Sequence, residues 1–304
     1  MNPMKTAIPF RLSPLSLAIA LVPFTHPVFA QDTDTRLQPV VVEAEQEKAA
    51  PLGGSGVSAD AVRVLRPATS DTASLLRDVP GVNLNAAGGV SSLPSIRGLA
   101  DDRLRIKVDG MDLIATCPNH MNPPLSYLDP SNVGTLQVFA GITPVSLGGD
   151  SIGGTIIADS VAPEFALPGE QLSKGELGAF YRSNNDAYGG NAAATFANEA
   201  FSINYNGSWS QADNYTAGDD FKTSKATGRL GHTLPLDEVG STAYDSQNNT
   251  LNMAFRNGDD QFEAKLGYQK MDEQLYPNQR LDLLDNEQKR INLGWFRDVD
   301  WGGL

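Results

Sequence analysis

Residues 201–210 (FSINYNGSWS) alternate between large apolar and small polar side chains except at Gly207, with Phe201, Ile203 and Trp209 on the apolar side. Successive side chains of a β-strand point to opposite faces, so this pattern predicts a strand with one apolar and one polar face. The same alternation recurs around Leu177, Tyr188, Leu251, Phe262 and Ile291. Strands of about ten residues with Asn/Ser/Gln-rich polar faces are typical of a transmembrane β-barrel that has lipid outside and water or a plug inside.

The connections between these segments support the same interpretation. Asn198-Glu199 and residues 257–260 are tight turns, whereas residues 211–249 and 272–286 are long and polar. Short turns at one end and long loops at the other are typical of outer-membrane barrels. Six strands in an open sheet would leave backbone groups unpaired in hydrocarbon. Either another element closes the barrel or the chain is truncated, and we expect residues 163–304 to be the first strands of an incomplete barrel.

The N-terminal residues 1–30 have the pattern of a cleaved signal peptide. Lys5 and Arg11 precede the apolar core Leu15–Phe24, which is too short to span a membrane, and Val28-Phe29-Ala30 is a small-residue cleavage site. We therefore expect the chain to be exported across one membrane.

Residues 31–56 are polar and contain glycine and proline, apart from Val40-Val41-Val42. This composition predicts a flexible arm and linker with a short extended segment that can add to the sheet edge of a partner. Composition alone leaves open a linker without a partner.

Charge and motifs exclude several classes of function. The net charge of −13 argues against a nucleic-acid partner, because phosphates are neutralised by Lys and Arg. The sequence holds no Ser-His-Asp constellation, no carboxylate pair with credible geometry and no phosphate loop, since Gly53–Gly56 lacks the Lys-Ser/Thr of such a loop. We expect no enzyme.

Residues 57–162 mix signals for helix and strand. Ser70–Arg77 predicts a short helix that Pro80-Gly81 ends. The strand candidates are Leu104–Val108, followed by an Asp109-Gly110 turn, then Val133–Phe139 and the segment around Ile156-Ile157. The region therefore predicts a small α+β domain ahead of the barrel strands.

Cys117-Pro118-Asn119-His120-Met121 holds the only cysteine of the chain, and a methionine follows it by four residues. A thiolate and a thioether are soft ligands that favour Cu(I). Their spacing predicts that both sulfurs share one face of a helical turn held between prolines, with His120 off that face. The alternative is a cysteine buried as a small hydrophobic residue.

The order of these regions resembles the TonB-dependent outer-membrane receptors. Leu37–Ala44 (LQPVVVEA) resembles the TonB box, and Leu76–Val82 (LRDVPGV) resembles the first plug signature. Ser95–Gly98 with Asp109-Gly110 resembles the plug core motif, and Val133–Ile157 resembles the closing motif. The chain departs from the family at Gly141–Pro144, where many members have Gly-Pro directly after the valine strand.

This resemblance implies an α+β plug followed by antiparallel transmembrane strands of an incomplete 22-stranded barrel in the outer membrane. The expected partners are the outer-membrane lipid and the energy-transducing protein TonB. The residues that would contact TonB are Leu37, Pro39, Val40, Val41, Val42 and Ala44.

Within the family, the Cys-x-x-x-Met loop resembles the copper-receptor branch, which implies copper as the transported ligand and Cys117 and Met121 as its ligands. That branch completes the site with a His-x-Met pair, which this sequence lacks and which we expect beyond Leu304. The alternatives are a receptor for an iron siderophore or another cargo, a passive outer-membrane surface that binds copper or serves in adhesion, and a soluble periplasmic domain.

Overall fold

The computed structural model describes residues 54–115, 117, 119–149, 151–277, 282–299 and 302–303. The expected signal peptide and TonB-box residues Leu37–Ala44 lie outside the described residues. Within the described ranges, no helix is long and apolar enough to cross a membrane.

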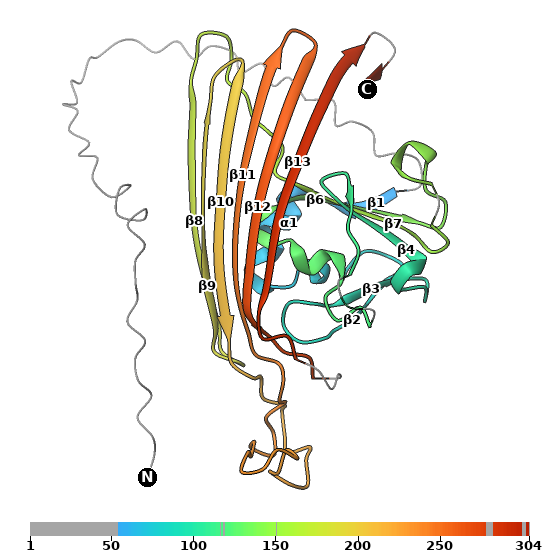
Figure 1. The fold of residues 1–304 in the computed structure, drawn as a ribbon, viewed down its shortest axis with the longest axis vertical. Helices are drawn as coiled ribbons and strands as arrows, with labels where there is room; N and C mark the ends of the chain where they lie inside the picture. Colours follow the sequence, from blue (N-terminus) through green and yellow to red (C-terminus); the bar gives the residue numbers. More distant parts are fainter. Residues whose placement is uncertain are drawn as a thin grey trace, which may run out of the picture. The chain divides into compact units, whose positions relative to one another are not determined.

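The first domain, in the described part of the chain, is a five-stranded sheet of order β1-β6-β7-β4-β5 with short helices packed against it (Figure 1). Its strands are β1 Gly54–Val57, β4 Leu104–Val108, β5 Met111–Asp112, β6 Val133–Ala140 and β7 Gly154–Ser160. A separate ribbon pairs β2 Val82–Asn85 with β3 Leu93–Ile96. The helical segments are α1 Ala59–Leu65, η1 Arg66–Ala68, η2 Thr72–Leu76, η3 Asp101–Arg103, η4 Pro124–Tyr127, η5 Pro130–Asn132 and η6 Val145–Leu147. The predicted α+β domain is thus confirmed.

Two local features differ from the sequence-based expectation. The helix expected over Ser70–Arg77 is a single 3-10 segment, η2, and it ends at Leu76, well before Pro80. The Thr72 hydroxyl donates to the backbone oxygen of Leu128, so tertiary contact fixes this short segment. Residues 54–56, assigned above to the linker, form the edge strand β1 together with Val57 and pair with β6.

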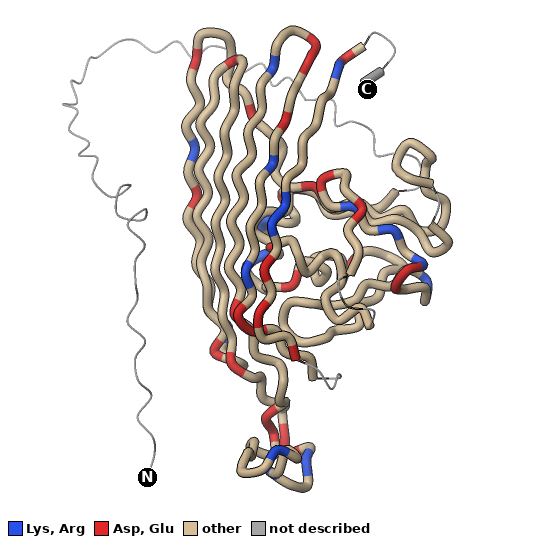
Figure 2. Tube along the Cα trace, in the orientation of Figure 1, with Lys and Arg blue, Asp and Glu red and all other residues tan. Residues whose placement is uncertain are grey.

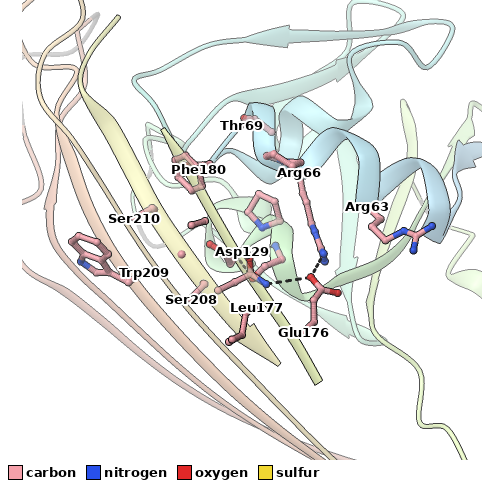
Figure 3. Close-up of a pocket in the computed structure, with 18 residues that line it drawn as sticks. Arg63, Arg66, Thr69, Asp129, Glu176, Leu177, Phe180, Ser208, Trp209 and Ser210 are labelled. Atoms are coloured by element: carbon pink, nitrogen blue, oxygen red, sulfur yellow. Dashed lines mark hydrogen bonds and ion pairs between the residues drawn. The ribbon is translucent and has the colours of Figure 1, made fainter. Parts of the chain in front are cut away.

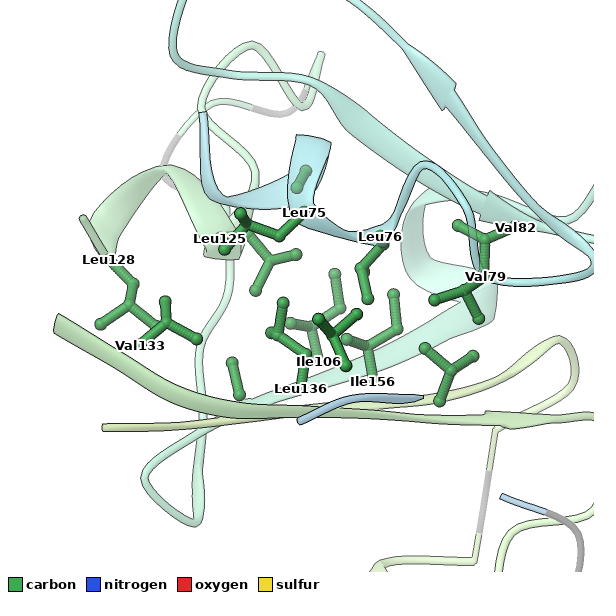
Figure 4. Close-up of a cluster of buried hydrophobic side chains, with 14 of the residues drawn as sticks. Leu75, Leu76, Val79, Val82, Ile106, Leu125, Leu128, Val133, Leu136 and Ile156 are labelled. Carbon is green, nitrogen blue, oxygen red and sulfur yellow. The ribbon is translucent and has the colours of Figure 1, made fainter. Parts of the chain in front are cut away.

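The core of this domain lies between the sheet and the short helices (Figure 4). Leu75 and Leu76 of η2 and Leu125 of η4 pack onto Ile106 and Ile156 of the sheet, and all five are buried. The sequence alternation of β4 supplies this face, since its buried residues are every second one.

Among the described residues, six long antiparallel strands follow in chain order, and the short β14 Gly302–Gly303 pairs with the last of them. They are β8 Leu172–Arg182, β9 Ala187–Ala197, β10 Phe201–Ala212, β11 Tyr244–Asn257, β12 Asp260–Gln274 and β13 Asn286–Val299. Each predicted strand is confirmed. Residues 213–243 and 275–285 connect strands at one end, and short turns connect them at the other. The end of the strands that carries these two long connections is here called the long-loop end.

The outward face of these strands carries large apolar side chains in register. Phe201, Phe255, Phe262 and Trp295 are directly paired across four strands and are exposed. Trp209 follows Phe201 by eight residues, about 27 Å along a strand. A strand tilt of about 40° reduces this to about 20 Å, near the height of the apolar band of outer-membrane barrels. This face therefore has the dimensions of a lipid-facing surface.

The inward polar face of the strands is hydrogen-bonded to the first domain. The Asn206 amide of β10 donates to the Ser131 backbone oxygen at 3.1 Å, and the Gln269 amide of β12 donates to the Ser126 backbone oxygen at 2.9 Å. Both acceptors belong to residues 124–132, which carry η4 and η5. A plug, rather than water, satisfies this part of the polar face.

An ion cluster joins the two parts further toward the short-turn end, where Figure 2 shows basic residues of β12 and β13 beside the plug. Lys265 Nζ lies 2.9 Å from Asp109 Oδ1, and Arg290 Nη2 lies 3.8 Å from Asp109 Oδ2. Burial acts to raise the pKa of Asp109, but the charge of Lys265 and hydrogen bonds from Ser160 outweigh burial and lower that pKa below 3.8. Asp109 therefore stays ionised and depends on its cationic neighbours.

We expect Lys265→Ala to destabilise the plug within the strands by about 3 kcal/mol, because it leaves the Asp109 carboxylate buried with only the more distant Arg290. Thermal unfolding in detergent and protease protection of the plug measure this loss. Lys289→Ala is the matched control, since that side chain is 74% exposed and pairs with Glu287 of its own strand; it is expected to change stability by no more than about 0.5 kcal/mol. Equal effects of the two variants would contradict the role of the cluster.

Candidate functional site

The segment from Cys117 to Met121 is a tight turn and not the helical turn expected from its spacing. The His120 amide donates to the Cys117 carbonyl at 2.9 Å, and His120 has a φ of +52°, outside the range of a right-handed helix. The Cys117 amide donates to the Asn122 side chain at 3.2 Å. A side-chain acceptor of this kind competes with helical hydrogen bonding, which explains the departure.

The two sulfur residues nevertheless belong to the same local packing. Met121 is 6% exposed and forms a small apolar cluster with Ala87 and Tyr276, and the half-buried Cys117 packs against the same cluster. This cluster is separate from the main plug core. The thiol is therefore neither deep in the hydrophobic interior nor free on the surface.

Antiparallel topology places this cluster at the long-loop end. Tyr276 belongs to the 275–285 connection, which directly follows β12, and the Leu275 carbonyl lies against Gly88 of the plug. Gly88 has a φ of +82°, and a Cβ there would lie 2.5 Å from that carbonyl. Only glycine fits this approach, so the plug and the loop are in close contact beside the sulfur pair.

Asn122 anchors the turn, although sequence reasoning did not identify it. Its side chain is buried, accepts from the Cys117 amide and donates to the Tyr127 hydroxyl at 2.6 Å. Tyr127 lies in η4, and the backbone oxygen of Ser126 in the same segment accepts a hydrogen bond from Gln269 of β12. A chain of hydrogen bonds thus runs from the strands to the turn. The tendency of Asn to bond nearby backbone groups was the available signal.

His120 is not part of the sulfur cluster. Its Nε2 lies 3.7 Å from Asp102 Oδ2, and its ring lines a cavity of about 190 Å³ together with Asp101 and Asp112. Among the described residues no group of three or more His, Cys, Asp or Glu is placed to hold a metal ion. A metal at Cys117 would therefore depend on the Met121 thioether.

Further cavities lie beside the strands. One of about 180 Å³ lies between the plug and β8–β10, where Arg66 already pairs with Glu176 (Figure 3). One of about 850 Å³ lies beside Asp109 and Lys265, and another, of about 1000 Å³, lies at the long-loop end. It has acidic lining residues, Asp186, Asp213, Glu238, Glu273 and Asp282, against the basic Arg229. We call it the acidic vestibule.

The first domain matches a known family. Residues 52–155 match the TonB-dependent Receptor Plug Domain. The chain is 30% identical over 182 residues to the Hemin receptor of Yersinia enterocolitica, covering 55% of this chain and 26% of that protein. It is 23% identical over 228 residues to the Heme transporter BhuA of Brucella suis biovar 1 (strain 1330), covering 74% of this chain and 33% of that protein. The chain spans about a third or less of the length of these relatives.

Solved structures extend the likeness to the strands. The Copper transporter OprC aligns with a TM-score of 0.64 at 23% identity, covering 81% of this chain and 34% of that one. The FrpB iron transporter from Neisseria meningitidis aligns with a TM-score of 0.62 at 17% identity, covering 83% and 38%. The matched proteins are named as receptors and transporters, which agrees with the prediction that the chain is not an enzyme. Residues 52–155 thus match the TonB-dependent receptor plug domain, and the six strands that follow have the fold of part of the barrels in these solved structures.

Proposed function

We propose that this chain is the plug and first barrel strands of a TonB-dependent outer-membrane receptor that binds and imports copper, with Cys117 and Met121 as the metal ligands. The observation that carries the proposal is that the chain's single cysteine packs against the small cluster that holds Met121, at the long-loop end. A thiolate and a thioether together select a soft ion, whereas Mg²⁺, Ca²⁺ and Mn²⁺ prefer oxygen ligands.

The surroundings support a cationic cargo. The acidic vestibule is next to the loop that covers the sulfur pair, and Asp282, one of its lining residues, accepts from the Tyr276 amide at 3.3 Å. Carboxylates in a concave site raise the local concentration of cations and speed their arrival. Copper ions would therefore be attracted before they reach the sulfur atoms.

Energised release belongs to the same proposal. Residues 37–44 would add to TonB as an extra strand, and force transmitted along the arm would reach β1, the plug edge strand that pairs with β6. The copper ion would leave toward the periplasm when the plug shifts. No covalent chemistry is involved.

Heme is the alternative cargo, because the Yersinia and Brucella relatives are named as heme proteins and the Neisseria structure as an iron transporter. Heme needs an axial ligand such as His, Cys, Met or Tyr, and His232 in the 213–243 loop lines the acidic vestibule. The many carboxylates of this cavity repel the propionates of heme, which favours the copper proposal. A siderophore or a passive copper-binding surface are the remaining alternatives.

In the full-length receptor, Cys117→Ser is expected to abolish tight Cu(I) binding, and Met121→Leu is expected to weaken it about tenfold or more by removing one soft ligand while keeping the side-chain volume. Competition with a Cu(I) chelator measures both. Met253→Leu is the control, because Met253 lies on β11 away from the site and its substitution is expected to leave affinity unchanged. Undiminished Cu(I) binding in Cys117→Ser would overturn the assignment. A wild-type receptor that binds hemin but not Cu(I), with hemin binding retained in both site variants, would also overturn it.

A second test separates import from passive binding. Val41→Pro is expected to abolish copper uptake by cells but leave Cu(I) binding intact, since proline removes a backbone donor needed for strand addition. Deletion of residues 37–44 is expected to do the same, and Glu47→Pro, just outside the segment, is expected to retain uptake. If uptake in Val41→Pro matches the wild type, the passive surface is the correct interpretation.

A further inference from the structure

Tyr276 packs in the same cluster as Met121, next to Cys117. It lies two residues after the end of β12, is 0% exposed and is in the same cluster as Met121 and Ala87, with Cys117 and Leu283 packed around it. Its backbone is held by the Asp282 side chain, and next to it the Gln274 amide donates to the Leu283 carbonyl at 2.9 Å. Both ends of the loop are thereby tied together, so the ring has a fixed position over the turn.

The hydroxyl of this tyrosine is an anomaly. Within the described residues it has no hydrogen-bond partner, although its surroundings exclude water. A buried hydroxyl without a partner costs about 1–3 kcal/mol, so such groups are rare unless a ligand completes them. A phenol hydroxyl carries its proton at neutral pH and can donate a hydrogen bond. Cys117 packs against the cluster to which Tyr276 belongs.

Metal binding to Cys117 would give this hydroxyl a stronger hydrogen-bond acceptor. A thiol is a weak acceptor, but when a metal–sulfur bond forms the S–H proton leaves to solvent and the sulfur carries negative charge. A protonated phenol can then donate to that sulfur. Groups that hydrogen-bond to metal ligands orient them, and their loss typically costs about 10–100-fold in metal affinity.

We infer that Tyr276 is a positioning residue of the copper site, whose buried hydroxyl donates a hydrogen bond to the metal-bound Cys117 thiolate while its ring closes the site against water. The inference rests on the proposed function of Cys117 and Met121. It assigns to the β12–β13 loop a role in holding the cargo, and it accounts for a tyrosine at this position where phenylalanine would fill the same space.

The test compares Tyr276→Phe with the wild type in the full-length receptor, using Cu(I) delivered from a competing chelator. Phenylalanine keeps the packing and removes the partnerless hydroxyl, so the unfolding temperature of the metal-free receptor is expected to stay the same or rise. The affinity is expected to fall about 10–100-fold. The ultraviolet charge-transfer band of the Cu(I)–thiolate bond is expected to move to longer wavelength, because a thiolate without its donor is a stronger electron donor. Tyr215→Phe, on a part-exposed tyrosine of the 213–243 loop, is the matched control.

The outcomes separate this inference from the proposal beneath it. Wild-type affinity and an unmoved band in Tyr276→Phe, with binding lost in Cys117→Ser, overturn the role of the hydroxyl only. Weaker binding with an unmoved band also overturns it, since packing alone would then explain the effect. Undiminished binding in Cys117→Ser overturns the copper site itself.

Discussion

The hydrogen bonds between the polar strand faces and plug residues 124–132 determine the position of everything else. A sheet with lipid-like dimensions on one side can present Asn, Ser and Gln on the other only if those groups find partners. Ser126 and Ser131 supply them through backbone oxygens. Each bond contributes only about 1 kcal/mol, but leaving either partner buried alone costs more. The plug is therefore fixed in register with the strands, and the sulfur turn, tied to η4 through Asn122 and Tyr127, is fixed with it.

Sequence alone was sufficient for the repetitive parts of this fold. Each of the six strands could be predicted from local sequence, because apolar and polar residues alternate along it, as they do around Phe201 and Phe262. The prediction of a helical turn at Cys117 was wrong, since a spacing of four residues is compatible with other conformations as well as with a helix. Asn122 was missed although its partners Cys117 and Tyr127 lie only five residues away and the tendency of Asn to bond nearby groups was a usable signal. Tyr276 was missed for a deeper reason, because its role arises from contacts with plug residues far away in the chain, which its own neighbourhood does not encode.

Cargo is harder to assign than fold for a related reason. Identity of 22–30% to heme proteins reflects the shared plug core and strand pattern, which any cargo requires. Loops carry specificity and vary most among relatives of one fold. The chemistry of Cys117 and Met121 is therefore more informative about the ligand than the overall likeness. The same reasoning explains why a copper transporter and an iron transporter align about equally well with this chain.

Under the proposed function, the aromatic residues of the strands near the long-loop end also set the depth at which a cargo would be captured. Tyr188 and Trp209 have ring centroids 5.2 Å apart, and Trp209 is level with Lys270 of β12 through Gln247. Four more residues carry β12 about 13 Å along the strand beyond that level, or about 10 Å along the membrane normal at a tilt of about 40°, before the 275–285 connection begins. Under the proposed function, the sulfur atoms would therefore lie outside the hydrocarbon. A copper ion would then exchange its water for sulfur before it meets the dielectric barrier of the bilayer interior, which would come only on the later passage past the plug.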